Sequence, residues 1–293
     1  MKLLQRIIII SILILPILIG LVMISGKEKS GISSTGFKKL GLVRVEGVID
    51  NSSSIVKQLQ SFRHDKSIAG VLLRVDSPGG AVAPSQEIYS ELIRFKKQNK
   101  PVIVSMGNLA ASGGYYVSSP AKKIFANPGT LTGSIGVIMT LPLYKDLTDK
   151  IGIKMRILKA GKFKDLASPY RMMSNPEENL MQALLDDTHK QFINDVAEAR
   201  GMNRDSLLLV ADGRIFTGKQ ALACHLVDTL GGYEDALQYL RHITGLGPKA
   251  SIVEKNERFS VFREWLVEEL IRIFPQLYGF LAPPSLHFLY TSE

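Results

Sequence analysis

The sequence has almost no cysteine, because Cys224 is the only one in 293 residues. One thiol cannot form a disulfide within the chain or build a cysteine-rich metal site. It leaves the redox compartment open, since a protein without disulfides folds in either environment. The five histidines are His64, His189, His225, His242 and His287. They lack a metal-binding spacing such as the H-E-x-x-H of a zinc hydrolase, so the histidines predict no metal site.

A concentrated basic segment is also missing. Lys and Arg number 36 against 27 Asp and Glu, a net charge of +9, yet the basic residues are scattered along the chain. No basic run is interleaved with aromatic residues, and the usual nucleic-acid motifs do not occur. We therefore expect no nucleic-acid partner. Anionic lipid headgroups suit the positive charge better.

Charge is absent from residues 7–24, which follow a short basic tip over residues 1–6. A helix of this length spans about 27 Å, close to the hydrocarbon thickness of a bilayer. A cleavable signal peptide has a shorter apolar region and an A-x-A-like site, whereas this stretch continues into Ser25-Gly26-Lys27. We predict an uncleaved transmembrane anchor at 7–24 and a flexible linker at 25–39.

The charges that flank this anchor leave its orientation open. Lysines after the apolar stretch outnumber Lys2 and Arg6, which favours a cytoplasmic C-terminal domain by the positive-inside count. A short basic tip before the first apolar segment, however, is how exported anchors begin.

Apolar strands alternate with amphipathic helices over residues 40–247. Strands are predicted over 40–45, 68–75, 101–106 and 123–126, and helices over 54–64, 85–97, 176–200 and 217–227. This alternation is typical of an α/β domain with a mostly parallel sheet and crossover helices. Thr217 is the predicted cap of the last of these helices.

The helix over 176–200 has a well-marked start, with Asn175 as the predicted cap, Pro176 next and two acids in the first turn. Apolar side chains recur at helical spacing and are expected to face inward. They are Leu180, Leu184, Leu185, Phe192 and Val196.

Residues 248–293 differ in character. An apolar stripe between residues 261 and 274 predicts an amphipathic helix, followed by a rather apolar tail with Pro283-Pro284. The polar face of this helix is acidic as well as basic. We therefore expect it to dock on its own domain or on another subunit rather than on a membrane surface.

Ser112, within Ala110–Tyr116, is the most informative residue for chemistry. Small neighbours expose its hydroxyl after an apolar strand and leave the N–H of Gly113 able to face an anion. Gly79 or Gly80, after the strand over 68–75, could supply a second amide of an oxyanion hole. Both motifs have a structural alternative, since small residues also permit close helix–sheet packing and glycines form ordinary turns.

A serine nucleophile also needs a base. His189 sits mid-helix in a solvated polar stretch, and His225 adjoins Cys224 on a helix, where neighbouring side chains do not face each other. A lysine in partly apolar surroundings can act as a neutral base, and residues 160–169 offer Lys162 and Lys164. The residues alone neither choose between these two lysines nor bring either near Ser112.

Five motifs follow one another in a distinctive order. They are Val75-Asp76-Ser77-Pro78-Gly79-Gly80, Ala111-Ser112-Gly113-Gly114-Tyr115-Tyr116, Thr132-Gly133-Ser134-Ile135-Gly136, Gly161-Lys162-Phe163-Lys164-Asp165 and Gly213-Arg214-Ile215-Phe216-Thr217-Gly218. Through them the chain closely resembles the signal peptide peptidase A family, in its short single-domain bacterial form. The likeness runs from about residue 40 to residue 240 and leaves out the C-terminal segment.

The resemblance implies a membrane-anchored serine endopeptidase with a Clp protease/crotonase-like fold. It implies Ser112 as the nucleophile, Lys164 as the general base and Ser134 as the residue that orients the lysine. It further implies that the amides of Gly79 and Gly113 form the oxyanion hole. The implied substrates are remnant signal peptides and other unfolded chains, and no metal or nucleotide is implied.

The same resemblance implies a catalytic domain on the extracytoplasmic side of the bacterial inner membrane. It also implies a ring- or dome-shaped homo-oligomer in which serine and lysine meet across a subunit boundary. Two alternatives are a related protease that trims a specific integral membrane partner and a catalytically inactive oligomeric scaffold. A crotonase-type acyl-CoA enzyme is less favoured, because its chemistry needs the glycines but not this serine and lysine.

Overall fold

The computed structural model describes residues 38–255 and 287–289. The predicted anchor at 7–24, the tip before it, nearly all of the linker and the helix predicted between 261 and 274 lie outside these residues. Across the described ranges, no helix is both long enough and apolar enough to cross a membrane.

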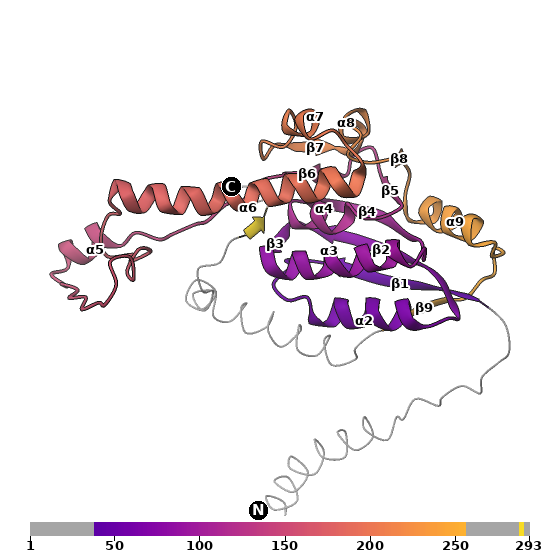
Figure 1. Ribbon diagram of the computed structural model, residues 1–293, viewed down its shortest axis with the longest axis horizontal. Coiled ribbons are helices and arrows are strands. Elements are labelled where there is room, and N and C mark those ends of the chain that lie inside the picture. The colour runs from indigo at the N-terminus through magenta and orange to yellow at the C-terminus, as the bar shows by residue number, and fades with distance from the viewer. Residues whose placement is uncertain (1–37, 256–286, 290–293) are drawn as a thin grey trace, which may run out of the picture. The chain divides into compact units, whose positions relative to one another are not determined.

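Strands form a mostly parallel sheet (Figure 1). They are β1 (Lys39–Glu46), β2 (Ile68–Ser77), β4 (Val102–Ala111), β5 (Lys123–Ala126), β6 (Leu131–Gly133), β7 (Ile215–Thr217), β8 (Thr229–Leu230) and β9 (Ile252–Glu254). Their order is β7-β6-β4-β2-β1-β9, and β5 pairs with both β4 and β8. Among the described strands of this sheet only β6 and β7 pair antiparallel. The predicted parallel sheet is confirmed.

Two short strands stand apart from this sheet. Strand β3 (Gly79–Ala81) pairs antiparallel with β10 (His287–Leu289), which comes from the C-terminal segment. Strand β3 directly follows the turn after β2, so the partner of β10 is the segment that carries Gly79 and Gly80.

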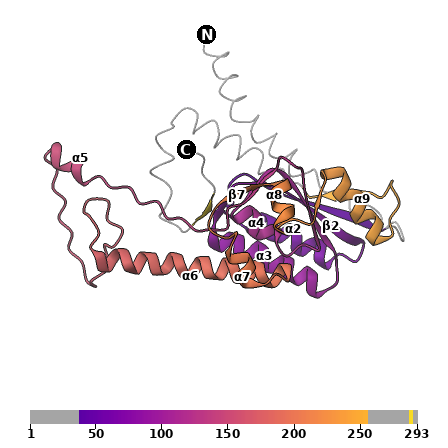
Figure 2. The same ribbon diagram turned by 90° about the horizontal axis from the view of Figure 1, so that it is seen from above.

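Helices lie on both faces of the large sheet (Figures 1 and 2). They are α2 (Ser53–His64), α3 (Val82–Lys97), α4 (Gly113–Ser118), α5 (Lys145–Lys150), α6 (Asn175–Arg200), α7 (Arg204–Leu208), α8 (Gly218–Ala223) and α9 (Tyr233–Thr244). The helix predicted at 217–227 ends earlier, at Ala223, and Thr217 caps it as predicted.

Two hydrophobic cores sit on the two faces of the sheet. In β2, Val71, Leu73 and Val75 pack on one face against α2, α3, α4 and α6, while Leu72 packs on the other face against α9. Side chains of a strand alternate between faces, so a strand buried on both sides is apolar throughout. This explains the continuous apolar run that marked β2 in the sequence.

Helix α6 begins one residue earlier than the sequence suggested. Ser174, not Asn175, is the N-cap, and Asn175 and Pro176 occupy the first helical turn. The side chain of Glu177 accepts a hydrogen bond from the backbone N–H of Ser174 at 2.9 Å. This contact is one of the two hydrogen bonds of a capping box. A capping box needs a Glu or Gln three residues after the N-cap, and Glu177 has that spacing from Ser174 but not from Asn175.

Only the C-terminal part of α6 packs on the sheet layer. Phe192 and Val196 are fully buried as predicted, whereas Leu180 and Leu184 are 39% and 47% exposed. The inward placement of these two leucines was wrong for the single chain. Figure 2 shows the reason, since the first half of α6 runs beyond the sheet and carries α5 at its far end. Helical periodicity identifies an apolar face of a helix, but not which sheet, helix or other chain packs against that face.

A buried acid lies between α2 and α3. Glu91 is fully buried and accepts hydrogen bonds from Arg63 Nε at 2.5 Å and Arg94 Nη1 at 2.7 Å. Arg63 is itself only 11% exposed. A buried ion pair gives little net stability when intact, but loss of one partner leaves an uncompensated charge in the interior.

We predict that Glu91→Ala lowers the free energy of unfolding by about 3 kcal/mol, because Arg63 then stays buried without an anion. Chemical denaturation of the full-length chain measures the change. As a control, Asp149→Ala removes the exposed pair of Lys145 and Asp149, and it should cost under about 0.5 kcal/mol. Equal losses in the two variants would contradict the prediction.

Candidate active site

Ser112 occupies a strained turn between β4 and α4. Its φ and ψ are 53° and −116°, a conformation that residues with a side chain rarely adopt. The backbone is held there by a hydrogen bond from Ser112 N–H to the carbonyl of Gly133, 2.8 Å long, and by another from Tyr116 N–H to the Ser112 carbonyl. Such strain costs on the order of 1–3 kcal/mol and clusters at functional turns.

The hydroxyl of Ser112 is buried and unpartnered. The residue is 1% exposed, and its Oγ has no hydrogen-bond partner among the described residues. Leaving a buried polar group without a partner costs about 1–3 kcal/mol. A native structure bears this cost where a substrate or another chain supplies the missing partner.

Gly79 and Gly113 lie side by side, although they come from two separate motifs of the sequence. A Cβ built on Gly113 would stand 3.1 Å from Gly79 Cα and 3.2 Å from the backbone nitrogen of Gly80. Gly79 has φ of +98°, which favours glycine. Its N–H donates to Ser77 Oγ at 3.1 Å. Gly113 is the first residue of α4, where an N–H has no partner within the helix.

Ser134 lies beside the turn that carries Ser112, because its neighbour Gly133 contacts that turn. Gly133, whose carbonyl accepts the hydrogen bond from Ser112, directly precedes it. Ser134 is 7% exposed, has φ of +50°, and donates its N–H to the carbonyl of Arg214 at 2.8 Å. The ends of β4, β6 and the turn before β7 therefore gather three of the five sequence motifs.

Lys164 is not part of this cluster within one chain. It belongs to the segment 138–174, here called the arm, which includes α5 and joins α6 at its N-terminal end. Figures 1 and 2 both show α5 far from α4. Lys164 and Lys162 are exposed. The single chain thus brings Ser112, Ser134, Gly79 and Gly113 together and leaves Lys164 apart.

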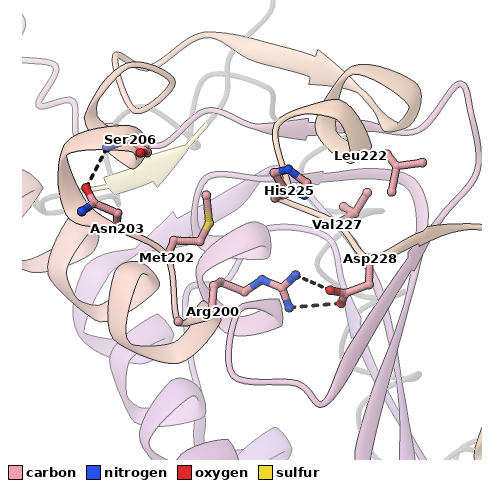
Figure 3. A pocket seen from close by; sticks show the side chains of 9 residues that line it. Arg200, Met202, Asn203, Ser206, Leu222, His225, Val227 and Asp228 are labelled. Carbon is pink, nitrogen blue, oxygen red and sulfur yellow. Dashed lines mark hydrogen bonds and ion pairs between the residues drawn. The ribbon is translucent and has the colours of Figure 1, made fainter.

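Neither candidate histidine serves Ser112. His189 Nε2 lies 3.1 Å from the carbonyl oxygen of Ile135, the residue after Ser134. His225, with φ of +58°, lines a cavity of about 470 Å³ beside Arg200 and Asp228 (Figure 3). The proposed catalytic residues do not line that cavity.

Asp195 of α6 supports α4, the helix that follows Ser112, and no motif in the sequence pointed to it. The hydroxyl of Tyr116 donates to Asp195 Oδ2 at 2.5 Å, and that of Tyr89 donates to the Asp195 carbonyl at 2.9 Å. The Tyr116 ring stacks at 4.8 Å on Tyr89 and meets Phe192 edge-on at 5.0 Å. Burial raises the pKa of the Asp195 carboxyl, with a smaller contribution from Glu198 and an opposing one from the Tyr116 hydrogen bond.

Two family models match the sequence. Residues 94–246 match Peptidase family S49, and residues 32–130 match Clp protease. The two matches overlap on the segment that contains β4, Ser112 and α4. The mostly parallel α/β sheet agrees with a Clp protease-like fold.

Several curated proteins are similar to the chain. It is 41% identical over 213 residues to a provisionally named protease, slr0021, from Synechocystis sp., covering 72% of this chain and 76% of the relative. It is 39% identical to a provisionally named signal peptide peptidase SppA from Enterococcus faecium, covering 74% and 63%. With Protease 4 from Salmonella typhi it shares 38% identity over 61% of this chain but only 29% of that longer protein.

We predict that Gly114→Ala destabilises the fold by about 1–3 kcal/mol, because overpacking against backbone is poorly relieved. The added Cβ would meet the Ser77 carbonyl oxygen at 2.7 Å and push α4 away from the end of β2. Denaturant unfolding measures the loss. Gly129→Ala is the control, since its Cβ would meet nothing within 4 Å. Similar stability of the two variants would refute the packing argument.

Stability should also depend on pH through Asp195. The pKa of the Asp195 carboxyl in the folded state is raised above that of an ordinary aspartate. Its contribution to folding stability is therefore fully present below the unfolded-state pKa and is lost as pH rises through the folded-state pKa. We expect Asp195→Asn to be more stable than the wild type at pH 8, with the difference shrinking toward pH 4. Thermal melts at both pH values measure it, and exposed Asp187→Asn is the control. A difference that grows as pH falls would have the wrong sign.

Proposed function

Since the chain belongs to peptidase family S49 and is a serine-type peptidase, we propose that it is an endopeptidase with a Ser112–Lys164 dyad. The neutral amine of Lys164 takes the proton of Ser112 Oγ as the oxygen attacks a peptide carbonyl. Protonated Lys164 then donates to the leaving amine. A water molecule activated by the same lysine releases the acyl group from Ser112.

The observation that carries this proposal is the buried, unpartnered hydroxyl of Ser112 on a strained turn. A structural serine would bond to a neighbouring carbonyl, as Ser118 Oγ does with the carbonyl of Gly114 at 2.7 Å. Ser112 instead keeps both its side-chain donor and its acceptor uncommitted within the described chain. That is the state a nucleophile needs before its base and its substrate arrive.

The oxyanion hole is proposed at the amides of Gly79 and Gly113. Their close approach supports this assignment, because two N–H groups that bind one oxygen must converge. Gly79 N–H must exchange its contact with Ser77 Oγ for the substrate oxygen. The exchange leaves Ser77 satisfied, because the Ser77 hydroxyl donates to the carbonyl of Gly47 at 2.6 Å.

A peptide substrate would bind along the edge of β3 that β10 occupies, and it would take the place of β10 there. Strand β10 shows that this edge accepts an extended segment, since Leu289 lies opposite Gly79 and His287 opposite Ala81 in an antiparallel pair. Pairing of this kind gives affinity through main-chain hydrogen bonds, which are independent of sequence. It would place a scissile carbonyl beside the glycines at the start of β3.

The base is proposed to come from a neighbouring subunit of a homo-oligomer. The arm exposes many large apolar side chains, between 37% and 83% of their surface, in one continuous stretch of sequence. They are Ile138, Leu143, Tyr144, Leu147, Ile151, Ile153, Met155, Ile157, Leu158, Phe163, Tyr170 and Met172. Apolar surface gathered in this way is typical of a protein interface. Contact between arms and neighbouring domains would deliver Lys164 and Ser134 to one site.

The membrane setting is part of the proposal. We place an anchor at residues 7–24, a linker at 25–39, the peptidase domain at 40–247 on the extracytoplasmic side and a C-terminal segment at 248–293. Remnant signal peptides are the proposed substrates. The apolar stretch at 7–24 and the resemblance to one relative named signal peptide peptidase SppA support this assignment.

We predict that Ser112→Ala and Lys164→Ala each abolish peptide cleavage without changing the oligomer, whereas Lys162→Ala stays active. Coexpression of the two inactive variants tests the shared site. Random mixing should restore about a quarter of the wild-type activity, because some sites pair an intact serine with an intact lysine from its neighbour. Cleavage is followed with a fluorogenic peptide. Full activity of Ser112→Ala would end the proposal, and no recovery on coexpression would place the dyad within one chain.

A further inference from the structure

Arg171 stands at the centre of the arm's strongest polar network. Its Nε donates to Asp165 Oδ2 at 2.9 Å, and its Nη2 donates to the Asp165 carbonyl at 3.0 Å. Its two terminal nitrogens also bind both carboxylate oxygens of Glu177, at 2.8 and 2.6 Å. One guanidinium therefore clamps two acids in the planar, forked geometry that arginine provides and lysine does not.

The two acids that Arg171 binds belong to different segments, one to the turn with Lys164 and the other to helix α6. Asp165 directly follows Lys164 in the turn over residues 161–168, and Glu177 forms the capping contact at the start of α6. Within the turn, Lys164 N–H donates to the Gly161 carbonyl at 3.2 Å. Arg171 thus fastens the backbone next to Lys164 to the first turn of a long helix.

A second cation closes the turn from its other side. Lys159 Nζ pairs with Asp165 Oδ1, and it also donates to the carbonyl of Lys162 at 2.9 Å. Both oxygens of the Asp165 carboxylate are therefore occupied, one by Arg171 and one by Lys159. The side chain is only 11% exposed, whereas Lys164 beside it is exposed.

The network lowers the pKa of both carboxyl groups. Hydrogen bonds from Arg171 and then Lys159 hold the pKa of Asp165 well below its usual range. Hydrogen bonds from Arg171 and then Ser174 lower the pKa of Glu177 to about 2. These contributions are lost only as pH falls through those lowered values, so the network is intact at any pH near neutrality.

We propose that Arg171 is a positioning residue for catalysis, an assignment that rests on the proposed role of Lys164 as the base. It holds the turn that carries Lys164 on the start of α6. It also keeps the Asp165 carboxylate away from the Lys164 amine. An ion pair between Asp165 and Lys164 would favour the ammonium form of the lysine, which cannot accept a proton.

Helix α6 extends this positioning toward the other half of the site. Its first turn binds Arg171 through Glu177, and its C-terminal part binds Tyr116 of α4 through Asp195. The turn with Lys164 is thus attached to a rigid element that is docked on the nucleophile layer of its own chain. In an oligomer, the position of each domain would therefore determine the position of Lys164 on its arm.

The test compares Arg171→Gln with a matched control in the full-length protein. We expect kcat to fall about 10- to 100-fold with KM within about threefold, because displacement of a catalytic group by about 1 Å costs that much. The oligomer size should stay unchanged. The melting temperature should fall, because Glu177 and Asp165 stay largely buried without the arginine, so kcat and KM are measured well below it. Lys145→Gln removes an exposed ion pair of the same arm and should keep wild-type kcat. Arg171→Lys should recover only part of the activity, because one ammonium cannot clamp both carboxylates.

The pH profile separates positioning from a general structural role. In Arg171→Gln, Asp165 keeps Lys159 but its Oδ2 loses its partner and can pair with Lys164, so the acid limb of kcat/KM should move up by about one pH unit. Adding Asp165→Asn to Arg171→Gln should move it back. Two results would overturn the positioning role alone. In the first, Arg171→Gln has the same kcat and pH profile as Lys145→Gln, while Lys164→Ala is inactive. In the second, Arg171→Gln loses activity because the oligomer dissociates. An active Lys164→Ala protein would instead overturn the proposed dyad.

Discussion

The backbone hydrogen bond from Ser112 to Gly133 is the contact on which the rest of the site depends. It extends the parallel pairing of β4 with β6, in which Ala111 lies opposite Gly133, by one residue into the strained turn. The strain at Ser112 is sustained because β4 and α4 are packed in the core on either side of it. Gly133 has no room for a side chain, since a Cβ there would meet the Phe216 ring at 2.6 Å.

Three of the other four motifs are gathered around the serine, and the motif with Lys164 is not. On the far side of β6, the antiparallel strand β7 pairs with Gly133 through Ile215, and the preceding Arg214 binds Ser134. On the near side, β2 ends at the turn that brings Gly79 beside Gly113. Motifs spread over more than half of the described chain thus converge at neighbouring strand ends. Parallel strands make this possible, because their carboxyl ends share one edge of the sheet.

The arm has the opposite character. Its apolar side chains face solvent in the single chain, while Lys159, Asp165 and Arg171 form a network with Glu177 at the start of α6. A segment built in this way keeps its own conformation but leaves an apolar surface uncovered. The same division runs along α6, whose C-terminal part is buried and whose first half is exposed. The helix thus links the layer that contains Ser112 to the arm that carries Lys164.

The sequence by itself determined the parallel α/β sheet, the positions of the long strands β1, β2 and β4 and of helices α2, α3 and α6, and the five ordered motifs that resemble a peptidase family. These features rest on periodicity and on neighbouring residues, which a sequence carries directly. It misplaced the cap of α6 by one residue, because Asn175 and Ser174 are both good caps and only the contact with Glu177 distinguishes them. It also misread Leu180 and Leu184, because periodicity does not say what covers a face. Only the tertiary structure decided that Gly79 adjoins Gly113, that Asp195 supports Tyr116 and that Ser112 has no partner within the described chain. Each of these depends on residues far apart in sequence, whose distances are set by how the sheet and its helices pack.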